Sequence, residues 1–186
     1  MPEKSEDLER LLHGLKNKDK EIRWSSAVAL VKLGSPVVDR LLPLLDDPQS
    51  ATRLLAAWAL GHIGDKRALK PLISALGDGD WSVRMRAADA LGELKDRSAI
   101  EHLVALLSDE NSTVRRHTVT ALSRIGDPSI APELTPVLRD PDWRVRMAGI
   151  MAYSLLGCEI PEDLKPLVLN DENGEVRKMA SSVLAH

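Results

Sequence analysis

The sequence predicts an all-α fold, an α-solenoid of about five to six helical hairpins with a period of 31 residues. Aromatic residues make up only 3% of the 186 residues and phenylalanine is absent, which disfavours a β-sandwich or barrel. The chain also repeats itself, and within each repeat the apolar residues follow helical spacing.

An arginine marks the repeat, because it recurs at intervals of 30 or 31 residues along the whole chain. It stands at Arg23, Arg53, Arg84, Arg115, Arg146 and Arg177. A large side chain follows seven residues later in every repeat, at Leu30, Leu60, Leu91, Leu122, Tyr153 and Leu184. These columns predict the buried face of one helix per repeat, called helix A here.

Start and stop signals set the bounds of helix A. Four residues before each arginine stands an Asp or Asn, except Gln49, and such side chains cap free amides in a first helical turn. Eleven residues after each of the first five arginines stands a glycine, with Lys95 as the exception, and glycine readily adopts the left-handed conformation that ends a helix. We therefore expect helix A at 19–33, 49–63, 80–94, 111–125, 142–156 and 173–185.

A second apolar stripe in each repeat predicts a shorter helix B. We expect it at 36–45, 66–77, 97–107, 129–139 and 161–169. Several of these segments contain proline, which is costly in mid-helix and tolerable in a first turn, so we expect short or kinked helices. Residues 5–15, with four leucines, predict a further helix that covers the first repeat.

This organisation predicts a single domain over 1–186, because stacked hairpins bury their apolar stripes against their neighbours. The N-terminal capping helix lies within 1–17. The repeats start near 18, 48, 79, 110, 141 and 172.

Two stretches carry a family resemblance: Asp80-Trp81-Ser82-Val83-Arg84, and the run from Ala57 to Asp65. They resemble the short HEAT-like repeats of the phycobilisome lyase type, from about residue 17 onward. The resemblance implies an armadillo-like solenoid. It leaves function open, because such proteins include bilin lyase subunits, adaptors, iron-binding hydroxylases and DNA glycosylases.

Composition and motifs disfavour an enzyme. The single Cys158 excludes a disulfide framework, no histidine directly precedes a glutamate as in the HEAT-like iron hydroxylases, and no phosphate loop or nucleophile motif occurs. We expect no catalytic residue, no cofactor and no metal site. The net charge of −3 argues against nucleic acid, and the absence of a long apolar run or signal peptide predicts a cytoplasmic protein without membrane segments.

A column of acidic residues lies six residues before the marker arginine. It comprises Asp47, Asp78, Asp109, Asp140 and Asp171, with Asn17 in the first repeat. Because the pair recurs in register, we interpret it as a structural ladder of charge-assisted hydrogen bonds between neighbouring repeats.

Helix A carries apolar residues at positions that solvent should cover, namely one and five residues after the arginine. The predicted protein-binding residues are Trp24, Val28, Leu54, Leu55 and Trp58. The alternative is that residues 5–15 fold over them. Met147 and Met151 occupy the same columns, and we expect them to fill the core, with an adaptable contact surface as the alternative.

The sequence thus favours a non-enzymatic scaffold or adaptor whose partner is another protein or a second copy of itself. The alternative is a lyase-like or chaperone-like subunit that acts on a bilin or another tetrapyrrole. A protein similar to the alkylated-DNA glycosylases ranks below both, because the exposed positions of helix B carry charges of both signs.

Overall fold

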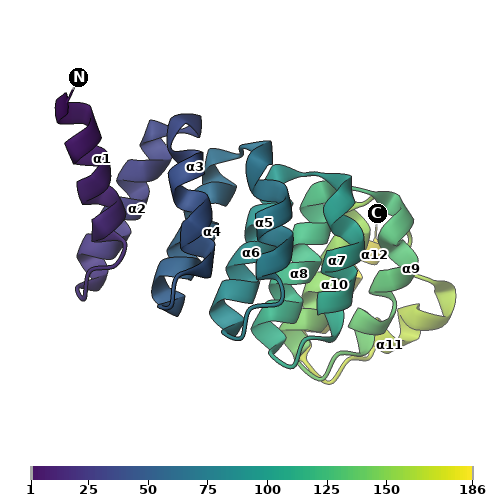
Figure 1. Cartoon of the computed structure of the whole chain (residues 1–186). Helices are drawn as coiled ribbons and strands as arrows, with labels where there is room; N and C mark the ends of the chain where they lie inside the picture. The colour runs from purple at the N-terminus through teal and green to yellow at the C-terminus, as the bar shows by residue number, and fades with distance from the viewer. Residues whose placement is uncertain (1, 186) are drawn as a thin grey trace. The chain divides into compact units, whose positions relative to one another are not determined.

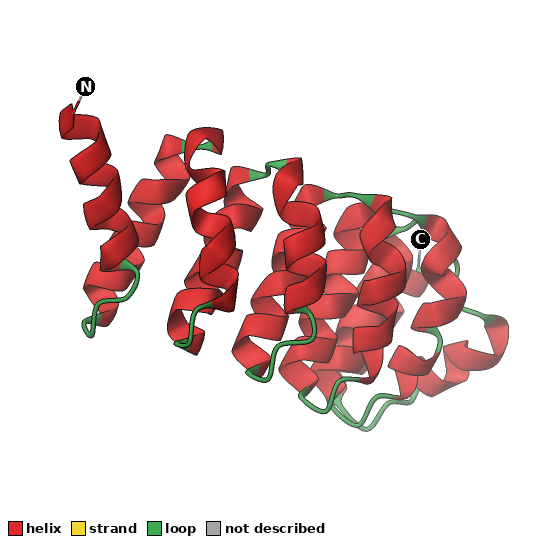
Figure 2. Cartoon of the chain, in the orientation of Figure 1, coloured by secondary structure: helices red, strands yellow, loops and turns green. Residues whose placement is uncertain are grey.

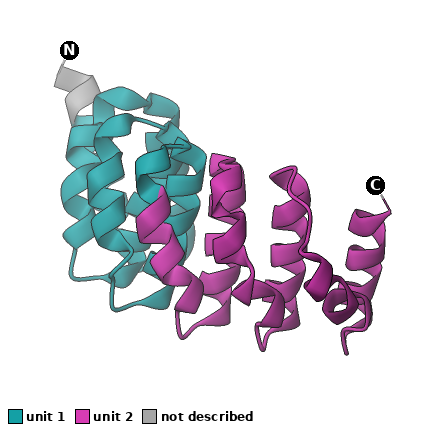
Figure 3. Cartoon of the chain, turned by 90° about the vertical axis from the view of Figure 1, so that its right-hand side faces the viewer, with its two compact units in different colours: residues 1–99 teal, residues 100–186 magenta. Residues whose placement is uncertain are grey.

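The structure is a computed structural model that describes residues 2–185, with side chains from residue 6 onward. This part of the chain holds twelve α-helices, eight 3-10 helices and no strand (Figures 1 and 2). The all-α solenoid of HEAT-like hairpins is confirmed. The chain divides into two compact units, unit 1 up to Ala99 and unit 2 from Ile100 on (Figure 3). The boundary falls inside the third helix B, and the single domain stays a prediction.

Unit 1 contains the capping helix and three A helices. The long helices are α1 (Pro2–Gly14), α2 (Lys20–Leu33), α4 (Ser50–Ile63) and α6 (Trp81–Leu94). Shorter elements connect them: η1 (Ser35–Val37), α3 (Val38–Leu41), η2 (Leu42–Asp46), η3 (Lys66–Ala68), α5 (Leu69–Ala75) and η4 (Arg97–Ala99). Helix α2 packs on α4, and α4 packs on α6.

Unit 2 contains the other three A helices, α8 (Ser112–Ile125), α10 (Trp143–Leu155) and α12 (Gly174–Leu184). Its shorter elements are α7 (Ile100–Ala105), η5 (Leu106–Ser108), η6 (Pro128–Ile130), α9 (Ala131–Leu134), η7 (Pro136–Arg139), η8 (Glu162–Leu164) and α11 (Lys165–Leu169). Helix α10 packs between α8 and α12.

The signals that predicted the A helices act as expected. The side chains of Asp19, Asp80, Asn111, Asp142 and Asn173 each accept a hydrogen bond from an amide of the first turn, and Gln49 makes none. Lys95, which stands where other repeats have glycine, has a φ of 52° and is the one described non-glycine residue with positive φ. The backbone conformation at this position is thus set by the repeat and not by the residue type.

The B segments are short, as their prolines predicted. The 3-10 turns that accompany each segment leave α-helical stretches of only four to seven residues. Pro43, Pro132, Pro136 and Pro166 lie at first or second positions of their elements, where a missing amide costs little.

The core runs along the inner face of the A helices. Leu30, Leu60, Leu91 and Leu122 are fully buried and Tyr153 is 1% exposed. The Tyr153 hydroxyl donates to the carbonyl oxygen of Ala131 at 2.8 Å, which satisfies its polar atom inside the core. Leu184, the last member of this column, is only half-buried, so the column is a packing column in the first five repeats.

The predicted ladder of arginine and aspartate is confirmed within both units. Each rung joins the guanidinium of one repeat to the carboxylate of the next through two hydrogen bonds, at 2.6 and 2.8 Å for Arg53–Asp78 and Arg115–Asp140, and at 2.7 and 2.8 Å for Arg146–Asp171. The same arginines also donate to backbone carbonyls of their own turn, at 2.8–2.9 Å. The guanidiniums of Arg53 and Arg146 hold the pKa of Asp78 and Asp171 below the usual range.

The first rung departs from the pattern. Asp47 is bound by Lys16 Nζ at 2.7 Å, and Arg23 donates to the carbonyl oxygens of Asn17 and Lys18. A lysine from the segment after α1 therefore takes the place that the marker arginine holds in the later rungs.

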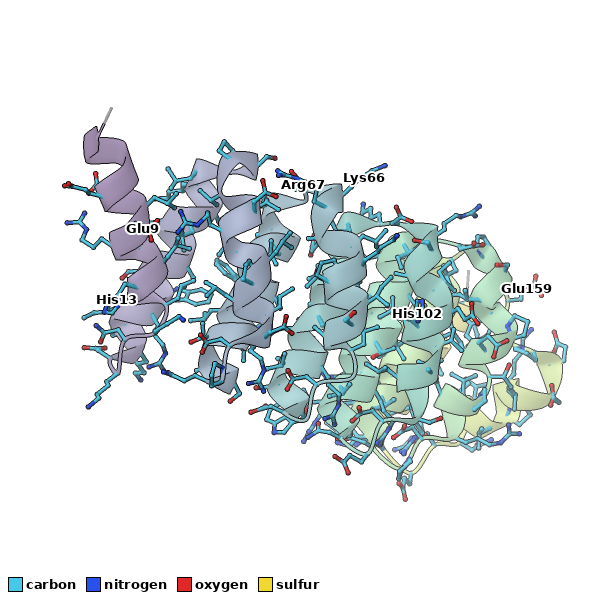
Figure 4. All side chains as sticks on the ribbon, viewed as in Figure 1. Glu9, His13, Lys66, Arg67, His102 and Glu159 are labelled. Atoms are coloured by element: carbon cyan, nitrogen blue, oxygen red, sulfur yellow. The ribbon has the colours of Figure 1, made fainter. Side chains whose placement is uncertain are left out.

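A second inter-repeat contact, which the repeat columns did not indicate, lies at the other end of the hairpins of unit 1. Arg67, at the turn before α5 (Figure 4), donates to Asp39 Oδ2 at 2.7 Å and to the carbonyl oxygen of Ser35 at 2.8 Å. It also binds Asp65, and this hydrogen bond lowers the pKa of the Asp65 carboxyl. The first two repeats are thus joined by Arg67 at one end and by Lys16 at the other.

Candidate functional site

The predicted protein-binding residues meet between α2 and α4. The ring centroids of Trp24 and Trp58 are 4.5 Å apart with an interplanar angle of 44°, and His62 continues the stack at 4.4 Å from Trp58. His62 Nδ1 lies 3.0 Å from the carbonyl oxygen of Trp58, one turn before it. Trp24 belongs to α2, whereas Trp58 and His62 belong to α4. The three rings therefore form one ridge across two A helices.

A pocket of about 400 Å³ opens beside this ridge. It is lined by Lys20, Glu21, Arg23, Trp24, Ala51, Leu54 and Leu55. Trp24 is 45% exposed, and Leu54 is half-buried. The pocket therefore combines an apolar wall with charges of both signs, contributed by the first turn of α2. We refer to it as the tryptophan pocket.

The capping helix packs elsewhere on α2. The backbone of Gly14 lies against Ser26, where an added Cβ would stand 2.1 Å from Ser26 Oγ. Ser26 follows Trp24 by two residues, and that is a rotation of about 200° around a helix. Among the described side chains, none from α1 lines the tryptophan pocket.

The predicted residues differ in where the structure places them. Trp24 and Leu54 line the pocket from two helices, and Trp58 stacks on Trp24. Leu55 also lines the pocket but is only 6% exposed, so it belongs mainly to the core. Val28 is half-buried and does not line the pocket.

The sequence reasoning missed His62 and the charged residues at the start of α2. The signal for His62 was present, because it follows Trp58 by four residues and such pairs share a helix face. Lys20, Glu21 and Arg23 carry no comparable signal, since charged residues are ordinary in a first helical turn.

Met151 is a correction to the expected core filling. It is 41% exposed, and Met147 is half-buried, so these methionines form part of the surface of α10. The reason is their register, because the positions one and five residues after Arg146 face away from the packed side of α10, whereas Met85 of α6, one residue after Arg84, is only 9% exposed.

Other kinds of site find little support within residues 2–185. No group of three His, Cys, Asp or Glu side chains is arranged to hold a metal ion, and no helix is long and apolar enough to cross a membrane. Arg146, one of the arginines available for a nucleic-acid surface, is 6% exposed and bound to Asp171. It belongs to the architecture.

Solved structures similar to the chain include two from bacteria and one from an archaeon. The Escherichia coli protein YibA is 26% identical with a TM-score of 0.82, over 95% of this chain and 69% of that one. The complex of CpcE and CpcF of phycocyanin lyase from Nostoc sp. PCC7120 is 28% identical with a TM-score of 0.69, over 95% of this chain and 75% of that one. An archaeal HEAT-like repeats protein from Thermococcus onnurineus NA1 is 22% identical with a TM-score of 0.61, over 98% and 79%, and shows the fold alone.

No curated protein matches the sequence. The sequence model of the family described as HEAT repeats matches residues 38–113 and 100–185, which together make up most of the chain. The lyase subunits among the similar structures agree with the resemblance that the repeat motifs carried. The chain therefore belongs to the HEAT-repeat family and has the HEAT-like repeats of the phycobilisome lyase type.

Proposed function

We propose that this protein is a non-enzymatic scaffold that binds another protein through the tryptophan pocket. The observation that carries this proposal is the exposure of Trp24, which is stacked on Trp58 beside an open pocket with an apolar wall. Large aromatic residues near the centre of an interface contribute most of the binding energy in many complexes. Nothing in the repeat pattern requires tryptophan at these columns.

The shape and charge of the pocket favour a partner that inserts one apolar side chain. Trp24 and Leu54 offer the apolar contact, whereas Lys20, Glu21 and Arg23 at the rim can hydrogen-bond a partner's backbone or polar side chains. The stack also restrains both tryptophan rings before binding, which reduces the entropy lost on association.

The test compares capture of partners by the wild-type chain and by the double variant Trp24→Ala/Leu54→Ser. We expect the variant to lose the specific partner while its circular dichroism stays helical. The matched control is Leu169→Ser, which removes a leucine that is 40% exposed on α11 and should leave capture unchanged. Equal loss in both variants, or unchanged capture by the double variant, would contradict the proposal.

Self-association through the same pocket is a separate outcome of this experiment. Size-exclusion chromatography with light scattering would then show a dimer for the wild type and a monomer for the double variant. That result would replace the external partner by a second copy.

A second candidate function is a subunit that handles a bilin or another tetrapyrrole. The observation that favours it is the 28% identity to the phycocyanin lyase complex. Incubation with a bilin, followed by desalting and visible spectroscopy, tests it directly. A retained and shifted absorbance band would favour this function over the scaffold, and a colourless protein would dismiss it.

A further inference from the structure

A second pocket lies between two A helices of unit 2 and differs from the first in its chemistry. It has a volume of about 240 Å³ and is lined by Arg116, Thr120, Ser123, Arg144, Met147, Ala148, Met151 and Leu155. We refer to it as the methionine pocket. Its walls are α8 and α10, which pack against each other.

The α10 wall is an exposed apolar stripe. Met147, Met151 and Leu155 are four residues apart along the helix, so their side chains lie in one row. Met151 is 41% exposed and Leu155 68% exposed. Methionine side chains are flexible and polarizable, which suits a surface that adapts to an apolar segment of another chain.

The charged groups of the pocket are all positive. Arg116 and Arg144 line it, and no acidic residue does. Arg116 Nη2 lies 2.9 Å from His117 Nε2, and Arg116 is the donor because a guanidinium has no acceptor atom. Within the described residues Arg116 forms no ion pair. Arg144 stands 5.5 Å from the centre of the Trp143 ring, and its nearest carboxylate oxygen, on Asp142, is 3.8 Å away. Both guanidiniums can therefore donate hydrogen bonds to a carboxylate of a partner.

The pocket has a basic end and an apolar end. Arg116 and Arg144 lie in the first two turns of α8 and α10, whereas Leu155 is the last residue of α10. These helices run in the same direction, since helix B returns the chain between them. From Arg144 to Leu155 the distance along the axis is about 16 Å, or three helical turns.

We propose that the methionine pocket binds an acidic amphipathic helix of another protein. Its aspartates or glutamates face Arg116 and Arg144, and its leucine-type side chains, one to three turns further along, cover Met147, Met151 and Leu155. Charge complementarity selects the acidic end, and burial of the apolar row supplies the affinity. The phosphates of a nucleic acid could bind the arginines at the basic end, but they would find no polar partner along the apolar row.

The test measures fluorescence anisotropy of a labelled helical peptide added to the full chain. The probe carries glutamates in its first turn and leucines two and three turns later. Two matched peptides replace the glutamates by lysine, or the leucines by serine. We expect the probe to bind at least about tenfold more tightly than either matched peptide, and to weaken as salt is raised.

Variants locate the binding on the protein. Arg116→Glu/Arg144→Glu should raise the dissociation constant of the probe at least about tenfold, and Met151→Ser/Leu155→Ser should do the same. The matched control Lys70→Glu reverses an exposed charge on α5, and Trp24→Ala alters the tryptophan pocket. Both should leave the affinity unchanged, and thermal melting checks that every variant is folded.

Several outcomes would overturn the assignment. If the lysine peptide binds as tightly as the probe, the pocket does not select acidic partners. If Lys70→Glu weakens binding as much as Arg116→Glu/Arg144→Glu does, the probe does not bind at the methionine pocket. Binding to phosphatidylserine vesicles that depends on both arginines, without binding of the probe, would assign the pocket to an anionic lipid surface. Because the tryptophan pocket is a control here, failure of one proposal leaves the other standing.

Discussion

The tryptophan pocket of unit 1 and the methionine pocket of unit 2 occupy equivalent places between neighbouring A helices. The columns one and five residues after the marker arginine differ between the helix pairs that form the two pockets. On α2 and α4 they hold Trp24, Val28, Leu54 and Trp58, and on α8 and α10 they hold Arg116, Thr120, Met147 and Met151. The arginine and core columns are nearly constant between the units. The stack thus fixes some columns and leaves others free, and the free columns are where the two units acquired different chemistry.

The largest expected effect tests whether the constant columns are structural. Arg146→Ala should lower the free energy of unfolding by about 3–5 kcal/mol, because it leaves the Asp171 carboxylate buried without its partner. Urea unfolding followed by circular dichroism measures this loss. If the loss stays below about 0.5 kcal/mol, the ladder is not structural and the contrast between constant and free columns fails.

Acid should weaken the ladder in both units. The folded-state pKa values of Asp78 and Asp171 lie below their usual range because of Arg53 and Arg146, so near pH 4 the unfolded chain binds more protons than the folded one. Their contribution is full above the unfolded-state pKa of about 3.9 and is lost as pH falls through the folded values. When melting temperatures are measured from pH 6 to pH 2, we expect them to decrease once the pH is below about 4. The decrease should be less steep in the double variant Asp78→Asn/Asp171→Asn than in the wild type.

The tryptophan stack should contribute modestly to stability. A double-mutant cycle with Trp24→Ala and Trp58→Ala should give a coupling energy of about 0.5–1.5 kcal/mol, the range for a stacked aromatic pair. Chemical unfolding of the four proteins provides it. A coupling near zero would mean that the rings do not restrain each other and that the first pocket is no more preorganised than the second.

The smallest expected effect is the oxidation of the methionine pocket, a reaction for which the tryptophan pocket has no methionine. Mild peroxide should convert exposed Met151 to its sulfoxide before Met85, which is 9% exposed, and the polar product should weaken the apolar end of the methionine pocket. Peptide mapping by mass spectrometry follows the modification, and probe anisotropy follows the affinity. Met151→Leu should resist this loss of affinity, and equal sensitivity of that variant would refute the mechanism.

Much of the architecture was predictable because its determinants are local. Asp80 and Gly64 fix the ends of helices through contacts within one turn, so the sequence alone indicated the bounds of the A helices. The ladder was predictable because it recurs. Its first rung was not, because Lys16 replaces the marker arginine only through the position of α1.

The candidate sites depended on finer geometry. Leu54 and Leu55 are neighbours in sequence, but about 100° of helical rotation turns the second side chain toward the core. Met151 was assigned to the core because methionine is a common gap filler, although its position five residues after Arg146 already predicted a solvent-facing side chain, as the structure has it. Arg116 and Arg144 came together through packing of α8 on α10, which no local signal encodes.

The ladder also determines how such a chain can change in length. Its aspartates are spaced by 31 residues, as from Asp47 to Asp78, while each rung between a marker arginine and an aspartate joins residues 25 apart. A gene duplication that starts at one aspartate and stops before the next copies one aspartate, which accepts from the preceding marker arginine, and one marker arginine, which donates to the following aspartate. Both new junctions then regain a complete rung, whereas an insertion of another length between the two halves separates them. Growth in whole repeats therefore preserves the cross-links without any compensating mutation.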